Sequence, residues 1–120
     1  MKYSWITLHV SDMERSITFY RDLLGLAVDR EFGNKKQKIV FLGEGDDAKI
    51  ELICMIGEKI VDAGKGVSIG FRVSGLDDMI DKFQKTVSVS IKGPFSPNQS
   101  IKFYMVSDPD GYQIQLYENL

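Results

Sequence analysis

The sequence predicts an α+β fold built from two tandem βαβββ modules, whose curved mixed sheets surround a cleft and carry their helices on the outside. A segment at residues 5–20 returns at residues 68–83, with these identical residues 63 positions apart: Ile6 and Ile69, Val10 and Val73, Ser11 and Ser74, Ile17 and Ile80. A later strand returns 64 positions on, since Ile50-Glu51-Leu52 corresponds to Ile114-Gln115-Leu116. A repeat of this length indicates that one supersecondary unit occurs twice.

The first module is expected over about residues 1–56. β-branched and aromatic residues predict a strand over residues 1–10, whose even positions pack on a helix and whose odd positions face a pocket. A capping box of Ser11 and Glu14 begins a helix that runs to about Leu24. Three further strands follow, separated by polar glycine-containing loops, over residues 26–32, 37–42 and 48–55.

The second module repeats this order over residues 67–120, after a linker with three glycines at about residues 57–66. Ser74 with Asp77 resembles a second capping box, for a helix that continues to about Lys85. Two prolines predict a loop over residues 93–98, because proline lacks a backbone donor and has a fixed φ. Residues 108–111, with the sequence DPDG, are a turn signature. The expected strands cover residues 67–73, 87–92, 100–106 and 112–117.

Size and composition describe a globular protein. A chain of 120 residues can bury a core of its own, so residues 1–120 are expected to form one domain. The net charge of −2 and the pI near 5.3 argue against a general role on nucleic acids or membrane surfaces, which requires a basic face. We see no apolar run of the ~20 residues that cross a bilayer and no signal peptide in the first twenty residues, which are patterned as strand and helix.

Cys54 is the single cysteine, so an internal disulfide is excluded. A chain without disulfides is typical of a reducing compartment, and a cytoplasmic location is expected. No histidine stands near Cys54 in the sequence, which favours a buried, inert thiol over a nucleophile.

Four separated features resemble one known family. The opening HVSDMERSITFYRDLLGL, the KIELI strand, the closing SDPDGYQIQLYE and the paired βαβββ order are similar to the vicinal oxygen chelate superfamily. That superfamily includes glyoxalase I, extradiol dioxygenases, fosfomycin-resistance enzymes and bleomycin-binding proteins. The resemblance covers essentially the whole chain and implies the fold, and through relatives that dimerise it implies a homodimer. It does not choose among these chemistries, because one fold hosts several functions.

The resemblance also implies where a metal site would lie: at Trp5, Glu51, Ser68 and Gln115, one residue from the first and one from the last strand of each half. The family's enzymes usually carry His, Glu or Gln at such positions. Only Glu51 and Gln115 remain as candidate ligands here, whereas a divalent transition metal takes about three or four good donors. We therefore expect no metal cofactor; a divalent metal held through Glu51 is the alternative.

Two polar side chains on the expected pocket wall allow more than one interpretation. His9 lies four residues beyond Trp5, about 13 Å along the strand on the same face, so it does not simply replace a ligand there. A hydrogen-bonded wall position, a ligand contact and an acid–base role are all open for His9. Glu51 must find a partner, stay hydrated or take up a proton, and His9 and Arg72 are its expected partners. It is either hydrated at the cleft mouth or binds a cationic or donating part of a ligand.

Trp5 is either core packing or a stacking surface at a former ligand position. The resemblance and strand parity place these residues around it as a partly aromatic lining: Thr7, His9, Ile39, Phe41, Ile53, Ser68, Arg72, Phe103, Met105, Gln115 and Tyr117. Which face of the last hairpin points inward depends on the turn register, which the sequence does not fix.

Three functions follow from these residues. The first is a glyoxalase/bleomycin-resistance-like protein that binds or sequesters a small molecule in its aromatic-lined cleft, without a metal and without catalysis. The second is a metal-dependent glyoxalase-like lyase, isomerase or dioxygenase with Glu51 as a catalytic residue; a metal-free acid–base role for Glu51 is also open. The third is an interaction module, which nothing in the sequence singles out. The expected partner is a small molecule, and neither nucleic acid nor membrane.

Overall fold

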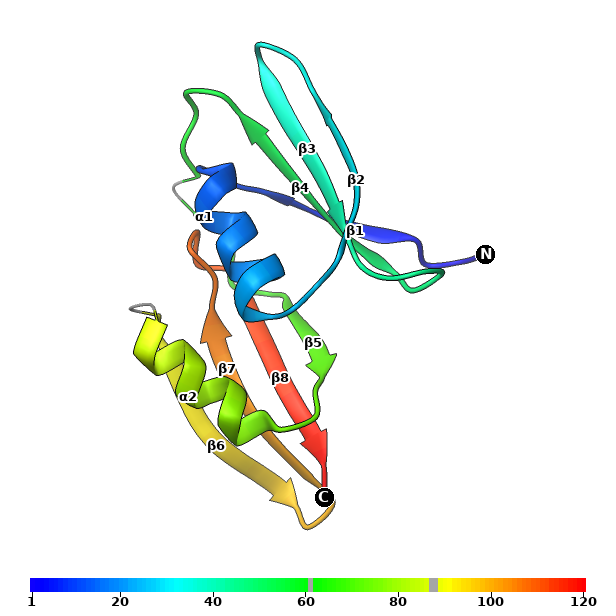
Figure 1. The fold of residues 1–120 in the computed structure, drawn as a ribbon. Helices are drawn as coiled ribbons and strands as arrows, with labels where there is room; N and C mark the ends of the chain where they lie inside the picture. Colours follow the sequence, from blue (N-terminus) through cyan, green and yellow to red (C-terminus); the bar gives the residue numbers. More distant parts are fainter. Residues whose placement is uncertain (61, 87–88) are drawn as a thin grey trace. The chain divides into compact units, whose positions relative to one another are not determined.

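A computed structural model describes residues 1–60, 62–86 and 89–120. The chain divides into two compact units, Met1–Val61 and Asp62–Leu120. Each unit contains one helical segment and one mixed four-stranded sheet, so the predicted α+β fold of two tandem βαβββ modules is confirmed (Figure 1). No helix in the described residues is long and apolar enough to span a bilayer.

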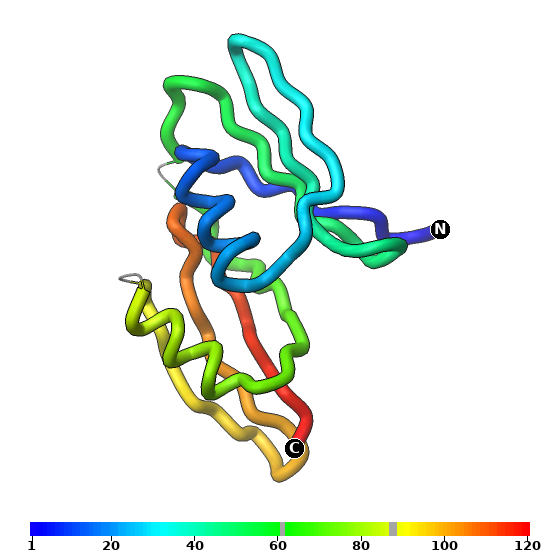
Figure 2. Tube along the Cα trace, in the orientation of Figure 1, coloured from blue at the N-terminus to red at the C-terminus, as the bar shows by residue number. Residues whose placement is uncertain are grey.

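Unit 1 has the strand order β1-β4-β3-β2. Its elements are β1 (Trp5–His9), α1 (Met13–Ile17), the π-helical turn η1 (Thr18–Leu23), β2 (Val28–Gly33), β3 (Gln37–Leu42) and β4 (Lys49–Met55). β1 pairs with β4 in parallel, and the other neighbours are antiparallel. The backbone trace in Figure 2 shows α1 and η1 as one continuous helical segment that connects β1 to β2.

The two faces of β1 differ in burial as the sequence predicts. Leu8 and Val10 are 4% and 1% exposed, whereas Trp5 is 50% exposed. On β4, Ile50 and Leu52 are buried as well, and α1 packs against this strand. The aliphatic face of the sheet therefore meets the helical segment, and the face that carries Trp5 is left open.

The start of α1 differs from the predicted capping box. The N-cap is Asp12, whose side chain accepts a hydrogen bond from the backbone N–H of Arg15 at 3.2 Å. The hydroxyl of Ser11 instead accepts the backbone N–H of Ile60 at 2.6 Å. The prediction of Ser11 as the cap was wrong because its side chain is used by the segment that follows β4, and the adjacent carboxylate takes its place.

The end of this helical segment is wound more widely than an α-helix. The N–H of Leu24 donates to the carbonyl of Phe19, five residues back, at 3.0 Å. The wider winding changes which residue faces the sheet, and Leu23 is buried whereas Leu24 is only half-buried.

Unit 2 repeats the topology with the strand order β5-β8-β7-β6. Its elements are β5 (Ser68–Arg72), α2 (Leu76–Thr86), β6 (Ile91–Asn98), β7 (Ile101–Ser107) and β8 (Gln113–Asn119). α2 packs against β8 and buries Leu76, Ile80 and Phe83. Among the described residues between β4 and β5, no helix or strand is found.

A charged network fixes the start of α2 to the sheet. The backbone N–H of Leu76 donates to Glu118 Oε2 on β8 at 3.3 Å. Lys102 on β7 pairs with Glu118 at 3.3 Å and with Asp77 on α2 at 3.0 Å. The first backbone N–H of the helix thus donates to a carboxylate of a strand that is distant in the sequence. The predicted capping box of Ser74 and Asp77 did not include this contact.

The predicted loop at residues 93–98 was wrong, because these residues belong to β6. β6 lies at the edge of its sheet, where proline is tolerated since one side of the strand needs no ladder donors. Its pairing with β7 is irregular, with register shifts on both sides of Phe95. Residues 87–88 of the strand predicted before this loop lie outside the described residues.

The predicted turn at residues 108–111 is confirmed. The Asp108 side chain is buried and accepts the backbone N–H groups of Asp110 and Tyr112 at 2.9 and 2.8 Å. Gly111 takes φ +95°, a conformation that glycine adopts readily. The turn joins β7 to β8 and so sets the register of the last hairpin.

Candidate functional site

The open face of the unit 1 sheet carries a row of four side chains that crosses all four strands. Thr7 on β1 pairs with Glu51 on β4, Glu51 pairs with Phe41 on β3, and Phe41 pairs with Arg30 on β2. Neighbouring strands lie about 4.8 Å apart, so the row spans roughly 14 Å. A hydroxyl and a carboxylate stand at one end of this row, and a guanidinium stands at the other.

Glu51 has a partner on the neighbouring strand. The hydroxyl of Thr7 donates a hydrogen bond to Glu51 Oε1. The carboxylate is half-buried, and this bond satisfies one of its oxygens while Oε2 can still accept from a ligand. The partner that the structure gives Glu51 is Thr7 on the neighbouring strand, and the expected pairing with His9 or Arg72 stays a prediction.

Three aromatic rings gather next to this row. Phe41 is the central ring, with Trp5 edge-on at 5.5 Å and Phe32 edge-on at 6.3 Å between ring centroids. The guanidinium carbon of Arg30 lies 4.6 Å from the Phe41 centroid and 5.8 Å from that of Phe32. Phe41 is buried, whereas Trp5 and Phe32 are 50% and 53% exposed. The cluster therefore offers aromatic surface to solvent, with a cation beside it.

A cavity of about 230 Å³ lies at the Trp5 end of this face, and Arg30 also lines it. The loop that follows β3 forms one wall and is held by Lys49. The Lys49 ammonium donates to the carbonyl oxygens of Glu44, Gly45 and Asp47 at 3.3, 2.6 and 2.8 Å. These bonds account for a lysine only 9% exposed and give the wall a defined position.

The open face of the unit 2 sheet has a corresponding arrangement. One row runs through Arg72, Tyr117, Phe103 and Phe95, with Phe95 and Phe103 rings 5.2 Å apart. The next row pairs Gly70 with Gln115, and Gln115 with Met105. Phe103, Met105, Gln115 and Tyr117 thus share one face of the last hairpin, which the sequence left undecided.

The predicted site residues fall into two groups, one in each unit. In unit 1 the open face carries Trp5, Thr7, His9, Ile39, Phe41, Glu51 and Ile53. In unit 2 it carries Ser68, Arg72, Phe103, Met105, Gln115 and Tyr117. His9 lies at the end of β1 opposite Ile53, one strand repeat beyond Thr7.

Arg30 and Phe32 complete the aromatic cluster, and the sequence analysis missed both. They alternate along an expected strand as Phe41 and Ile39 do on the next one, so the sequence shows that they share a face but does not show which face. A register shift between Val28 and Arg30 changes the parity at the start of β2. Such a bulge cannot be located from the spacing of residues alone.

The positions that the resemblance assigns to a metal carry unequal donors. Glu51 offers an anionic oxygen, while Ser68 and Gln115 offer neutral oxygens. The indole N–H of Trp5 is a hydrogen-bond donor only. In residues 1–60, 62–86 and 89–120, no group of three or more His, Cys, Asp or Glu side chains that could hold an ion is found.

Curated proteins similar in sequence are lactoylglutathione lyases. The chain is 31% identical over 121 residues to a probable lactoylglutathione lyase of Vibrio cholerae, a match that covers 93% of this chain and 86% of that protein. It is 33% identical over 123 residues to the lactoylglutathione lyase of Haemophilus influenzae, which covers 93% and 88% of the two chains.

Solved structures share the fold. The trypanothione-dependent glyoxalase I of Leishmania major superposes with a TM-score of 0.85 at 27% identity, over 98% of this chain and 86% of that one. An antibiotic binding protein from Streptomyces sp. CB03234 has a TM-score of 0.71 at 20% identity, over 100% and 97% of the two chains, which is a likeness of fold alone. A family model matches residues 2–116, and the chain belongs to the Glyoxalase/Bleomycin resistance protein/Dioxygenase superfamily.

Proposed function

We propose that this protein binds a small, flat, partly apolar molecule on the open face of its unit 1 sheet, and that binding needs no metal ion. Trp5 is the observation that carries the proposal. Its indole is half exposed and packs edge-on against Phe41, at a position where the family resemblance implies a metal-binding side chain. A half-exposed ring supported by a second ring is a stacking surface for a ligand.

The polar groups of the same face support this proposal by offering two kinds of orienting contact. Glu51 accepts from Thr7 through one oxygen, so its other oxygen can accept from an N–H or O–H of a ligand. Arg30 lies over the Phe41 ring and can donate to an acidic or carbonyl oxygen. A flat ligand with a donor at one edge and an acceptor at the other suits this pair.

The donor set does not suit a transition metal. Among the four implied positions only Glu51 supplies an anionic ligand, and its carboxylate is already bonded to a hydroxyl. A divalent transition metal is usually held by about three or four imidazole, thiolate or carboxylate groups. We therefore assign no reaction step to a metal and treat Glu51 as a ligand-orienting residue.

The test uses 8-anilinonaphthalene-1-sulfonate as a probe, because it combines flat aromatic rings with an anionic group. Wild-type protein should bind the probe in the presence of EDTA, in a titration that follows probe fluorescence. Trp5→Leu and Phe41→Leu should each weaken binding by about fivefold to tenfold, since an aromatic pair contributes about 1 kcal/mol beyond its buried area.

Tyr3→Leu is the matched control. Tyr3 is an exposed aromatic residue of the same unit, 63% exposed, and it makes no ring contact within the described part of the chain. Its replacement should leave the dissociation constant unchanged within about twofold. Probe affinity that is the same for wild type and Trp5→Leu would refute the role of the indole.

A metal-dependent lyase is the second candidate, because the lactoylglutathione lyases match this chain over more than nine-tenths of its length. This function predicts a stoichiometric divalent metal in protein purified without chelator, together with lactoylglutathione lyase activity. Glu51→Gln should then abolish both. Metal-free protein that binds the fluorescent probe through Trp5 and lacks lyase activity would exclude this candidate.

A further inference from the structure

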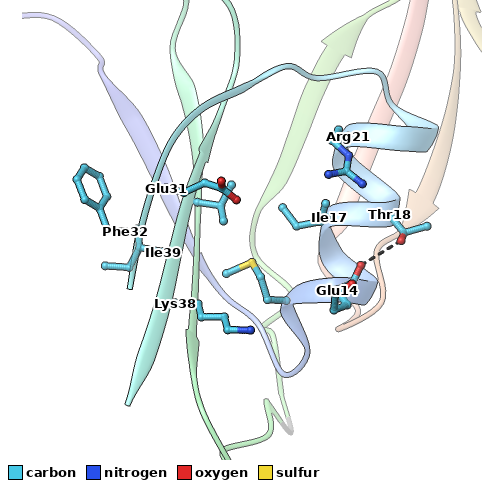
Figure 3. A pocket seen from close by; sticks show the side chains of 10 residues that line it. Glu14, Ile17, Thr18, Arg21, Glu31, Phe32, Lys38 and Ile39 are labelled. Carbon is cyan, nitrogen blue, oxygen red and sulfur yellow. Dashed lines mark hydrogen bonds between the residues drawn. The ribbon is translucent and has the colours of Figure 1, made fainter. Parts of the chain in front are cut away.

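A second groove lies on the helical side of the unit 1 sheet (Figure 3). Its volume is about 300 Å³, and it separates the α1–η1 segment from the hairpin of β2 and β3. Ile17 and Val40 line it with apolar surface. The groove exists because the short helical segment packs against β4 and leaves the outer strands β2 and β3 less covered.

Charged side chains of both signs line the two walls of this groove. The helical wall contributes Glu14 and Arg21, and the strand wall contributes Glu31 and Lys38. Glu31 and Lys38 extend from their strands toward the helical segment, and Arg21 lies on the helical segment (Figure 3). The groove therefore has a carboxylate and a cation on each wall.

The strand-borne pair is spaced by the sheet register. Lys38 pairs with Gly33, and Glu31 lies two residues before Gly33 on the same strand. Two residues along β2 and one step across to β3 put the Cα atoms of Glu31 and Lys38 about 8 Å apart. Both side chains line the same groove, and their spacing is fixed by the pairing of two strands and not by a loop.

These charges do not neutralise one another across the groove. In the part of the chain that the structure describes, no ion pair within 4.0 Å joins Glu14, Arg21, Glu31 or Lys38 to another of the four. Arg21 instead pairs with Asp22 through its Nε at 2.8 Å. The pKa of Arg21 is raised, chiefly by its hydrogen bond to Asp22, with smaller contributions from Glu14 and Glu31. Glu14, Glu31 and Lys38 are thus left without an ion pair among the described residues, and Glu31 and Lys38 are the two of opposite sign on the strand wall.

The charge pattern selects one class of ligand. An anion would meet the carboxylates Glu14 and Glu31, and a cation would meet Arg21 and Lys38. A neutral apolar molecule would displace water from the charged groups without replacing the hydrogen bonds of that water, which is unfavourable. A molecule that carries both an ammonium and a carboxylate gives Glu31 and Lys38 each an opposite partner.

We propose that this groove binds a small zwitterion, with its carboxylate on Lys38 and its ammonium on Glu31. The volume lies at the lower end of the range of ligand pockets, roughly 300–1,000 Å³, which suits a molecule of dipeptide size. A dipeptide also separates its two charges by several bonds, as the spacing of Glu31 and Lys38 requires. The groove lies on the opposite side of the sheet from Trp5 and Glu51, so this proposal is independent of the proposed function.

The experiment is an NMR titration of the 120-residue protein with glycylglycine. Acetylglycine, which has only the carboxylate, and glycinamide, which has only the ammonium, are the two comparison ligands. We expect saturable amide shifts confined to residues 13–21 and 31–40. The apparent affinity for glycylglycine should be at least about fivefold higher than for either comparison ligand, because each of those leaves one charge unpaired.

Variants of exposed residues test the assignment without disturbing the fold. Glu31→Gln and Lys38→Gln should each weaken glycylglycine binding about fivefold or more. Lys36→Gln, which removes an exposed lysine of the neighbouring turn, is the matched control and should retain wild-type affinity. The double exchange Glu31→Lys with Lys38→Glu should restore binding to within about threefold of wild type, because both signs are again present in reversed order.

The proposal is overturned if glycylglycine causes no saturable shifts. It is also overturned if both single variants keep wild-type affinity, or if the shifts fall outside the two segments. Equal affinity for glycylglycine and acetylglycine would assign the groove to anions alone and likewise contradict the zwitterion.

Discussion

Thr7 and Glu51 show how a pairing between two side chains prepares a surface for binding. They are directly opposite each other on β1 and β4, and the hydroxyl of Thr7 donates to the carboxylate. A half-buried carboxylate loses part of its hydration, and a hydrogen bond to the charged form compensates for that loss. The bond also limits the rotamers of Glu51, so its second oxygen keeps one orientation on the open face.

Thr7→Val should therefore destabilise the protein although the two side chains have the same shape. The Glu51 carboxylate loses its donor, and we expect the free energy of unfolding to fall by about 0.5–1.5 kcal/mol. Urea unfolding measures this difference. Thr7→Ser keeps the hydroxyl and should retain most of the stability. A Thr7→Val variant as stable as wild type would mean that water replaces the bond without loss.

At the scale of single elements, both helical segments begin with carboxylates that differ from the predicted capping serines. Asp12 caps α1 from the adjacent position, while Glu118 reaches the first N–H of α2 from β8. Local caps are visible in the sequence, whereas a cap supplied by a distant strand depends on the folded topology. The two helices are therefore anchored by local and by tertiary contacts, respectively.

Asp12→Ala should lower the free energy of unfolding by about 1 kcal/mol, because the N–H of Arg15 loses its acceptor at the end of a helix. Asp12→Asn keeps an oxygen acceptor and should recover most of that loss. Chemical denaturation of the two variants provides the comparison. If the Asp12→Ala and Asp12→Asn variants had the same free energy of unfolding, the cap would not contribute to stability.

Lys102 links α2 to its sheet through Asp77 and Glu118, and this link predicts a pH dependence. The pKa of Lys102 is raised above its ordinary value of 10.5, first by the hydrogen bond to Asp77; desolvation opposes the rise and Glu118 adds to it. A lysine whose pKa is higher in the folded state stabilises the fold fully below pH 10.5, and this contribution is lost as the pH rises through the folded pKa.

Wild type should consequently have a higher free energy of unfolding than Lys102→Met at neutral pH. The difference should be constant up to about pH 9 and should shrink above about pH 10. Urea midpoints across this range measure the margin. Lys92→Met, on the edge strand of the same unit, should show no comparable change with pH. A margin that grows toward alkaline pH would have the wrong sign for this account.

At the scale of the whole molecule, the repeat and the strand patterns predicted the element order of both units, because amphipathic periodicity is a local property. The open faces of β1 and β4 were also predictable, since strand parity places Trp5, Thr7 and Glu51 together. The contribution of Arg30 was not predictable, because a bulge in β2 sets its side. The edge position of β6, which allows its two prolines, is likewise a property of the assembled sheet.

The family and the side chains of the site lead to different expectations about a metal ion. The relatives are named lactoylglutathione lyases and the family resemblance implies a metal site, whereas Trp5 and Ser68 provide no strong metal ligand in this chain. A scaffold keeps its core when such surface positions change, because Leu8, Val10 and Leu52 on the opposite face hold the sheet to its helix. We propose on this basis that ligand binding by aromatic stacking takes the place of metal chemistry on this fold.

Thermal unfolding with and without divalent metals tests this replacement most directly. Protein stripped with EDTA and then given Ni²⁺, Zn²⁺, Mn²⁺ or Fe²⁺ should unfold at the same Tm as the stripped protein, because a ligand stabilises only the state that binds it. A rise of several degrees with one of these ions, lost in Glu51→Gln, would contradict the account and identify a metal site at Glu51.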